Sequence, residues 1–461
     1  MAGKWKETTL GKISKEEHGL VDGPFGSNLP ASSYVAEGIP VIRGSNLSVG
    51  EERFKGKDFV FVTEAFAKKL ERSMCAPGDI IFTKKGTIGQ TGIIPKNHEF
   101  NRFLLSSNQM KLSVDTEIAD PLFVYYYVSS PASIAKVLQE ANVAGVPKTN
   151  VAYFKQFPIL LPPLDEQRRI AHILGTLDDK IELNRRQNET LESLARALFQ
   201  SWFVDFDPVR AKASGEAEAA ICQRLGLSPQ VLALFPAALE NSVLGEVPVE
   251  WEVSDLGSFL EVLETGRRPK GGVSGFSEGI PSVGAESIVG IGKFDFQKTK
   301  YVPSSFFEKM KSGLVNSEDV LLYKDGGKPG DFRPRVSMFG YGFPFEVFAI
   351  NEHVFRLRSN ELGQPFLYMQ IGDERVLHEL RHRGAKAAIP GINQSDVKSL
   401  KLVVPSVALL TLYNETAGAI FHQILLNAST NQQLAALRDE LLPRLLSGEL
   451  SMAAVTEEVY G

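Results

Sequence analysis

The chain has 461 residues, of which 43% are hydrophobic and 23% charged, and its formal net charge is −5. This length predicts roughly two to four domains, each able to bury a proper core. The acidic balance argues against a surface that binds nucleic acid everywhere, whereas local basic patches remain compatible with phosphate binding. The two cysteines lack disulfide or metal spacing, and neither an apolar leader nor a membrane-length span is apparent, so we expect a cytoplasmic protein.

The first part of the chain, residues 1–160, has the pattern of a mixed, strand-rich domain. Short β-prone runs at 58–62 and 79–82 are separated by glycine-rich turns. Pro162 and Pro163 end this domain, because a proline can continue neither a strand ladder nor a helix.

A long helix is predicted next, within a spacer segment of residues 161–206. Asp165 stands at the expected N-cap and Glu166 in the first turn, and the helix should run to about Phe203. About 40 residues at 1.5 Å each make a rod of roughly 60 Å. Its apolar positions alternate in steps of three and four, the spacing of a coiled-coil seam. The seam contains Ile170, Leu174, Leu177, Ile181, Asn184, Asn188, Leu191, Ala195, Leu198 and Trp202.

The chain then repeats itself after an Ala- and Pro-rich connector, residues 207–246, in which we expect one or two short helices. A second strand-rich domain is predicted over 247–404 and a second spacer segment over 405–461, whose helix should cover roughly 407–447. Gly38-Ile39-Pro40-Val41 recurs as Gly279-Ile280-Pro281-Ser282, and Gly78-Asp79 recurs as Glu318-Asp319. The second seam contains Tyr413, Ala417, Ile420, Ile424, Asn427, Asn431, Leu434, Arg438, Leu441 and Leu445.

Both seams carry an asparagine pair at the same place, since Asn427 and Asn431 are Asn184 and Asn188 shifted by 243 residues (427 − 184). Polar seam residues cost stability but fix register, because only one alignment lets them bond each other. An antiparallel pairing would place Asn184 opposite Asn431 and Asn188 opposite Asn427. The sequence therefore predicts an α+β protein with two pseudo-twofold-related α/β domains, separated by an antiparallel coiled coil of two long helices.

Basic, amide and hydroxyl residues gather in glycine-containing loops of both copies. Those in the first copy are Arg43, Ser45, Asn46, Lys84, Lys85, Thr87 and Lys148. Those in the second copy are Arg267, Arg268, Lys270, Lys324, Lys328, Arg333, Arg335, Lys386 and Asn393. Arg and Lys suit phosphates and guanine, and Asn suits adenine. One such loop alone indicates a solvated turn, but matching sets in two domains favour a two-headed DNA reader.

Enzyme-like motifs are weak. His378-Glu379-Leu380-Arg381-His382 has the H-E-x-x-H spacing of zinc peptidases, yet no third ligand follows it and its neighbours are basic. Residues 86–92 are glycine-rich but match neither a P-loop nor a dinucleotide fingerprint. We therefore expect no catalytic residue, no metal and no cofactor on this chain. A stand-alone DNA-binding regulator and, more remotely, a zinc peptidase using His378 and His382 are the alternatives.

Several segments together resemble the specificity subunits of type I restriction–modification systems. Residues 157–171 (FPILLPPLDEQRRIA) resemble the entry into the family's central conserved helix, and residues 201–206 (SWFVDF) resemble its exit. Residues 38–41 and 78–82 resemble anchors of the recognition domains, and 405–406 and 445–450 resemble the second conserved region. Glu318 in place of Gly78, and Ser406 in place of Pro163, depart from the pattern.

This resemblance implies two target-recognition domains held apart by a coiled-coil spacer, each reading one half of a bipartite, asymmetric site in double-stranded DNA. It implies a non-catalytic subunit that joins two methylation subunits, which bind S-adenosylmethionine, and a motor nuclease subunit for restriction. No base-contacting residue is transferred by motif, so the predicted DNA contacts rest on residue chemistry and loop position alone.

Overall fold

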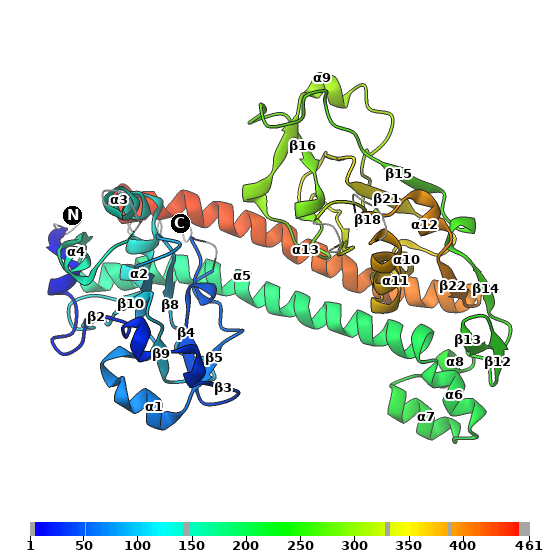
Figure 1. The fold of residues 1–461 in the computed structure, drawn as a ribbon, viewed down its shortest axis with the longest axis horizontal. Coiled ribbons are helices and arrows are strands. Elements are labelled where there is room, and N and C mark those ends of the chain that lie inside the picture. Colours follow the sequence, from blue (N-terminus) through cyan, green and yellow to red (C-terminus); the bar gives the residue numbers. More distant parts are fainter. Residues whose placement is uncertain (1–4, 51, 142–147, 328–331, 386–389, 451–461) are drawn as a thin grey trace, which may run out of the picture. The chain divides into compact units, whose positions relative to one another are not determined.

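The computed structural model describes residues 5–50, 52–141, 148–327, 332–385 and 390–450. The chain divides into two compact units (Figure 1). Unit 1 consists of Met1–Ile181 and Gln433–Gly461, and unit 2 of Glu182–Gln432. Two long helices, α5 (Leu164–Phe199) and α13 (Val407–Leu446), each contribute to both units. No helix among the described residues is long and apolar enough to cross a membrane.

Unit 1 contains two sheets and a strand pair. The first sheet is antiparallel, with the order β2 (Leu20–Asp22), β10 (Gln109–Leu112), β7 (Ile80–Thr83) and β8 (Thr91–Ile93). The second has the order β3 (Tyr34–Val35), β5 (Val60–Val62), β4 (Ile39–Ile42), β9 (Phe103–Leu105) and β6 (Met74–Cys75), with β4 and β9 parallel. β1 (Lys6–Thr9) pairs with β11 (Pro158–Leu161). Its shorter helices are α1 (Glu64–Lys69), α2 (Pro121–Ser129), α3 (Pro131–Ala141) and α4 (Val151–Gln156).

Unit 2 repeats this arrangement with a smaller second sheet. Its antiparallel sheet has the order β15 (Val262–Thr265), β21 (Val354–Arg358), β18 (Val320–Tyr323) and β19 (Val336–Met338). Its second sheet has the order β17 (Lys300–Val302), β16 (Ile280–Val283) and β20 (Ala349–Ile350), again with one parallel pair, β16 and β20. β14 (Glu252–Asp255) pairs with β22 (Lys401–Val404). Its shorter helices outside the connector are α9 (Ser304–Phe307), α10 (Gln364–Gly372), α11 (Glu374–Gly384) and α12 (Gln394–Lys398).

A buried ion pair recurs at the same point of both antiparallel sheets. Asp79 precedes β7 and pairs with Lys111 of β10 at 3.4 Å, while Asp319 precedes β18 and pairs with Arg356 of β21. Each aspartate also accepts a hydrogen bond from a backbone amide three residues earlier, at 2.9 and 2.7 Å. Glu318 keeps the positive φ of the glycine that precedes Asp79, at 65° against 90°. The turn is therefore conserved between the units despite the loss of glycine.

The connector holds more structure than the sequence predicted. It folds into three short helices, α6 (Asp207–Ala213), α7 (Glu218–Leu225) and α8 (Pro229–Leu232), followed by the hairpin β12 (Leu239–Ser242) and β13 (Gly245–Pro248). The expectation of one or two helices was therefore too low. A left-handed glycine ends α7, and Ser228 caps α8, so local turn chemistry divides this segment into short pieces.

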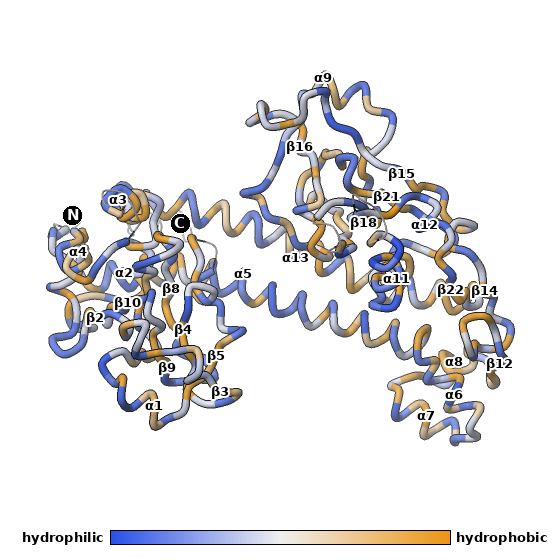
Figure 2. Tube along the Cα trace, viewed as in Figure 1, coloured by the Kyte–Doolittle hydropathy of each residue, from blue (hydrophilic) through white to orange (hydrophobic). Residues whose placement is uncertain are grey.

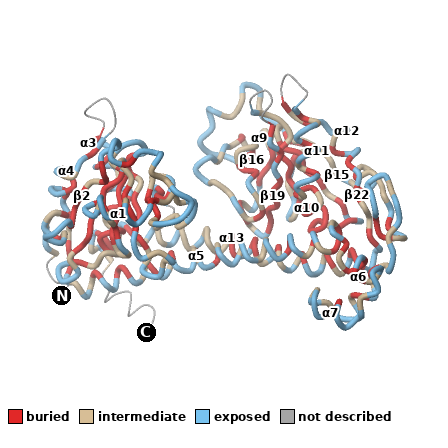
Figure 3. Tube along the Cα trace, turned by 60° about the horizontal axis from the view of Figure 1, so that its bottom comes forward, coloured by how far each residue is buried: buried red, intermediate tan, exposed pale blue. Residues whose placement is uncertain are grey.

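The predicted start of α5 is also corrected. The helix begins at Leu164, and the carbonyl of Pro163 accepts the amides of Glu166 and Gln167 at 2.9 and 3.0 Å, so Asp165 lies in the first turn and is not the N-cap. At the other end α5 stops at Phe199 and passes into a π-helical turn. Hydrophobic and hydrophilic residues alternate along both long helices, and their buried sides join the cores of the two units (Figures 2 and 3).

In unit 2 the two long helices contact each other through the predicted asparagines. Asn184 Nδ2 donates to Asn431 Oδ1 and Asn427 Nδ2 donates to Asn188 Oδ1, both at 2.8 Å. These are the two pairs expected from an antiparallel alignment, and the pairing 184–431 and 188–427 means that the helices run in opposite directions where they touch. Asn188 Nδ2 further donates to the carbonyl of Ile424 at 3.1 Å.

Candidate nucleic-acid interface

An open cleft in unit 1 brings together three of the loops between its strands. Its volume is about 540 Å³, within the usual range for ligand sites. The lining residues are Tyr34, Arg43, Gly44, Ser45, Thr83, Lys85, Gly86, Thr87, Gln90, Ser106, Ser107, Asn108 and Gln109. Apart from Tyr34 of β3, they come from the turn after β4, from the end of β7 and the hairpin to β8, and from the connection between β9 and β10 with the first residue of β10. Two of them are cations and none is a carboxylate, so the cleft suits an anionic, hydrogen-bonding ligand.

Four of the predicted DNA contacts lie in this cleft. Ser45, Lys85 and Thr87 are exposed, and the half-buried Arg43 is held by a bond from its Nη2 to the carbonyl of Asp58 at 3.0 Å. The exposed Lys148 pairs with Lys85 as an isolated β-bridge, which places it beside the same hairpin. Five predicted residues from three separate segments therefore meet at one place.

One predicted contact of unit 1 is corrected, and a second already has an acidic partner. Asn46 is fully buried, its Oδ1 accepts the amide of Arg43, and its Nδ2 donates to the carbonyls of Lys55 and Lys57. It therefore stabilises the turn after β4 and does not face DNA. Lys84 forms an ion pair with Asp22 at 3.0 Å and its side chain is 21% exposed, so its DNA contact stays a prediction.

The cleft also contains residues that sequence reasoning missed, among them two glutamines. Gln90 Oε1 accepts a hydrogen bond from Thr83 at 3.1 Å, and Gln90 Nε2 donates to the carbonyl of Leu47 at 3.4 Å. Gln109 is only 1% exposed, and its Oε1 accepts a bond from the Ser106 hydroxyl. Gln109 begins a strand of alternating polar and apolar residues, a pattern that gives no sign of a binding role. No sequence signal marked Tyr34 or residues 106–108 either.

The predicted contacts of unit 2 that the structure describes differ in the partners of their side chains. Arg267, Lys270 and Arg333 are exposed. Arg268 forms an ion pair with Glu352 at 2.6 Å, Lys324 pairs with Asp325, and Arg335 lies 5.0 Å from the ring centre of Tyr323 and donates to the carbonyl of Ala285. Asn393 is exposed and its side-chain oxygen caps helix α12, so its DNA contact stays a prediction. Lys328 and Lys386 lie outside the described residues.

Equivalent positions of the two units carry different chemistry. The strand ladders align Gln109 with Val354 and Thr83 with Tyr323, and the hairpin bonds align Gln90 with Arg335. In the turn after the parallel strand, Ser45 aligns with Glu286. Burial opposes the charge of Glu286, but the hydrogen bond from Lys300 prevails and lowers the pKa of that carboxyl. One fold therefore presents two different sets of hydrogen-bonding groups.

The zinc alternative gains no support from the geometry. His378 and His382 are exposed on α11, and Glu379, the general base of such a motif, forms an ion pair with Arg383. No group of three metal-ligand side chains is found among the residues that the structure describes.

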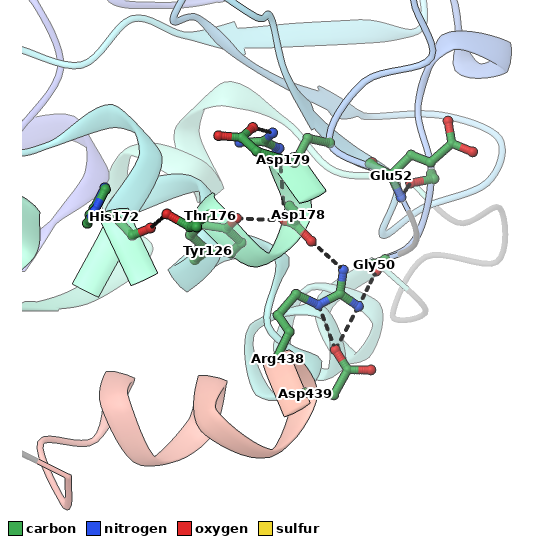
Figure 4. A network of polar contacts seen from close by, with 11 residues as sticks. Gly50, Glu52, Tyr126, His172, Thr176, Asp178, Asp179, Arg438 and Asp439 are labelled. Atoms are coloured by element: carbon green, nitrogen blue, oxygen red, sulfur yellow. Dashed lines mark hydrogen bonds and ion pairs between the residues drawn. The ribbon is translucent and has the colours of Figure 1, made fainter. Parts of the chain in front are cut away.

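An ion-pair cluster within unit 1 joins the long helices to the strand-rich part (Figure 4). Arg438 of α13 pairs with Asp178 of α5 at 2.8 Å and donates to the carbonyl of Gly50 at 3.3 Å. Tyr126 donates to the other oxygen of Asp178 at 2.6 Å, and Arg53 binds the adjacent Asp179. Burial disfavours the charge of Arg438, but Asp178 outweighs this and raises the pKa of its guanidinium. Arg438, a predicted seam residue, therefore contributes an ion pair with Asp178 at this position.

Comparison with known proteins agrees with this architecture. The family model "Type I restriction modification DNA specificity domain" matches residues 31–193. The chain is 24% identical over 456 residues to the type I restriction enzyme MjaIX specificity subunit of Methanocaldococcus jannaschii, covering 97% of this chain and 96% of the relative. It is 26% identical to the HindI specificity subunit of Haemophilus influenzae, covering 80% of this chain and 87% of the relative.

A solved structure supports the fold. The crystal structure of the type I restriction–modification S subunit from M. genitalium matches with a TM-score of 0.55 at 14% identity, covering 96% of each chain. Specificity subunits are non-catalytic parts of their complexes, so the prediction of a non-catalytic subunit is confirmed by these relatives. Residues 31–193 therefore match a type I restriction modification DNA specificity domain, and the chain is similar over most of its length to proteins named as type I specificity subunits.

Proposed function

We propose that this chain supplies the DNA sequence specificity of a type I restriction–modification complex by reading a bipartite, asymmetric site, one half with each strand-rich domain. The observation that carries the proposal is the cleft of unit 1. It gathers two cations, several hydroxyls and three side-chain amides without a carboxylate. Cations bind phosphates, while amides and hydroxyls form hydrogen bonds with base edges. The cleft can therefore both position the DNA backbone and distinguish the bases.

The two half-sites should differ in sequence. A duplicated fold with identical clefts would read a symmetric site, as symmetric dimers read palindromes. Here Gln109, Gln90 and Ser45 of unit 1 correspond to Val354, Arg335 and Glu286 of unit 2. We therefore assign residues 1–160 and 247–404 as two target-recognition domains with different targets.

The long helices should set the spacing between the half-sites. Helices of 36 and 40 residues at 1.5 Å per residue span roughly 54–60 Å, or between one and two turns of DNA at about 34–36 Å per turn. In this proposal residues 161–206 and 405–461 form the spacer, and the asparagine pairs fix its register. The exposed faces of the two long helices, together with the connector 207–246, offer docking surfaces. Two methylation subunits would bind there and supply S-adenosylmethionine, and restriction subunits would join the same complex.

The test is co-expression of the full chain with its methylation subunits, followed by sequencing of host DNA for N6-methyladenine. The expected result is a bipartite, asymmetric methylated motif that disappears when this chain is omitted. Arg43→Ala and Lys85→Ala should weaken methylation or relax one half-site only. Lys69→Ala, which removes an exposed cation of α1 outside the cleft, is the matched control and should leave the motif unchanged. Absence of chain-dependent methylation with active partners would refute the proposal and favour a stand-alone regulator.

A further inference from the structure

The two cleft glutamines of unit 1 converge on a single point, marked by a glycine. A Cβ built on Gly44 would lie 3.2 Å from Gln90 Oε1 and 3.6 Å from Gln109 Nε2. Because Gly44 has no side chain, both amide ends face the open cleft at this point. The φ angle of Gly44 is outside the left-handed region, so the backbone does not itself require glycine here. Glycine at this position keeps the two amides accessible.

The orientation of each amide is set by its neighbours. The Ser106 hydroxyl donates to Gln109 Oε1, which leaves Nε2 as the end that reaches the cleft. This Nε2 makes no hydrogen bond to the residues that the structure describes, and it is not one of their buried unpaired polar atoms, so the end of this otherwise buried residue opens into the cleft. Gln90 Nε2 bonds to the Leu47 carbonyl, so Gln90 turns its oxygen toward Gly44. The floor of the cleft therefore offers one donor beside one acceptor.

Water in the open cleft can accept from this donor in the free protein, and a base edge that supplies an acceptor there replaces the water with a direct hydrogen bond. In the major groove, adenine presents an acceptor at N7 beside a donor at N6, the complement of this arrangement. Guanine presents two acceptors, N7 and O6, one of which would face Gln90 Oε1 and be repelled. A phosphate oxygen would meet the same repulsion, and Arg43 and Lys85 on the cleft wall suit it better.

We propose that Gln109, oriented by Ser106 and paired with Gln90 across Gly44, is a specificity-determining residue that selects an adenine in the half-site read by the first recognition domain. The inference rests on the proposed function and assigns a base to one part of it. Val354 replaces Gln109 at the equivalent position of unit 2 and has no polar group. The adenine preference therefore applies to one half-site only.

The experiment compares methylated motifs made by the complete complex with the parent chain and with Gln109→Glu. Glutamate has the same shape but replaces the donor with an acceptor, which repels N7. One adenine position in one half-site should lose its preference, and methylation of the parent motif should fall about 10- to 100-fold. Gln139→Glu, an exposed position of α3 outside the cleft, makes the same charge change and should leave the motif unaltered. An unchanged motif and rate with Gln109→Glu would overturn the inference.

Gly44→Ala gives a second test that leaves both glutamines in place. Its methyl group should restrict the approach to both amides and relax the same adenine position. If Gln109→Glu yields no folded complex, retention of the full motif by Gly44→Ala overturns the inference. If the parent complex itself gives no motif, the proposed function fails. If it gives a motif in which neither substitution alters an adenine position, only the role of Gln109 fails.

Discussion

Substitution of Asn431 by leucine should destabilise unit 2 far more than the loss of one helix-surface amide would suggest. Asn184 is 1% exposed, its Nδ2 donates to Asn431 Oδ1 at 2.8 Å, and its own Oδ1 is buried without a partner among the described residues. Asn431→Leu leaves the whole Asn184 amide unsatisfied in an apolar seam, at a cost of about 1–3 kcal/mol. Asn184→Leu removes the buried orphan oxygen and leaves a half-buried Asn431 that water reaches, so it should cost less than about 1 kcal/mol.

The double variant Asn184→Leu/Asn431→Leu should be close to the parent in stability, because replacing both partners of a buried polar pair by apolar residues is often neutral. The coupling free energy of the cycle should then equal the sum of the two single costs, about 1–4 kcal/mol in magnitude. The cycle is measured by urea unfolding and tryptophan fluorescence, with Trp5 replaced by phenylalanine. Trp202 and Trp251 then remain, and both are buried in the core of unit 2. The measurement thus reports one unit of a chain that is too long to unfold in two states.

Gln433→Leu, an exposed position two residues along the same helix, controls for the helix propensity of leucine. Equal effects of the two single substitutions, or a cycle that adds without coupling, would refute the reasoning. Either result would mean that the asparagine pair contributes no cooperative hydrogen bond to the seam.

Three further outcomes are expected, each read as a shift in the free energy of unfolding. Tyr413→Phe should stabilise unit 2 by about 1 kcal/mol, because the Tyr413 hydroxyl is buried without a partner among the described residues, and destabilisation would contradict this. Arg438→Met should cost about 1–3 kcal/mol, because it removes the closest cation from Asp178 and leaves this carboxylate with the Tyr126 hydroxyl and the more distant Arg53 at 3.9 Å. Adding Asp178→Asn should recover part of the loss, and no recovery would contradict this. Burial opposes the charge of Glu192, but Arg196 and Lys293 prevail and lower the pKa of its carboxyl below the usual 4.5. The ionised carboxylate therefore stabilises the folded state fully above pH 4.5, and this stabilisation is lost as the pH falls through the folded-state pKa. Glu192→Gln should weaken this acid sensitivity, and an unchanged pH profile between 3 and 5 would count against it.

The sequence by itself determined the long-range plan of the protein through local periodicity. The seam of the first long helix can be recognised within one stretch of sequence, because its apolar positions follow steps of three and four and include two asparagines. The same pattern recurs 243 residues later (427 − 184), and this repetition predicted that the second long helix is its partner. The contact pairs 184–431 and 188–427 follow from that pattern once the direction is chosen. The equivalent turns of the two units could also be recognised from the sequence. Asp79 and Asp319 occupy the same place in these turns, even though Gly78 is replaced by Glu318 in the second copy.

Only the tertiary structure decided which loop residues face a ligand. Asn46 and Gln109 are both polar residues near glycines or turns. The amide of Asn46 donates its hydrogen bonds to carbonyls of its own loop, whereas the amide of Gln109 points toward Gly44. Gly44 and Gln109 meet because β4 pairs with β9 and β10 pairs with β7. Pairing between distant strands leaves no period in the sequence, and a side chain's partners depend on it. The coiled-coil seam could therefore be predicted from the sequence, whereas the residues that line the cleft of unit 1 could not.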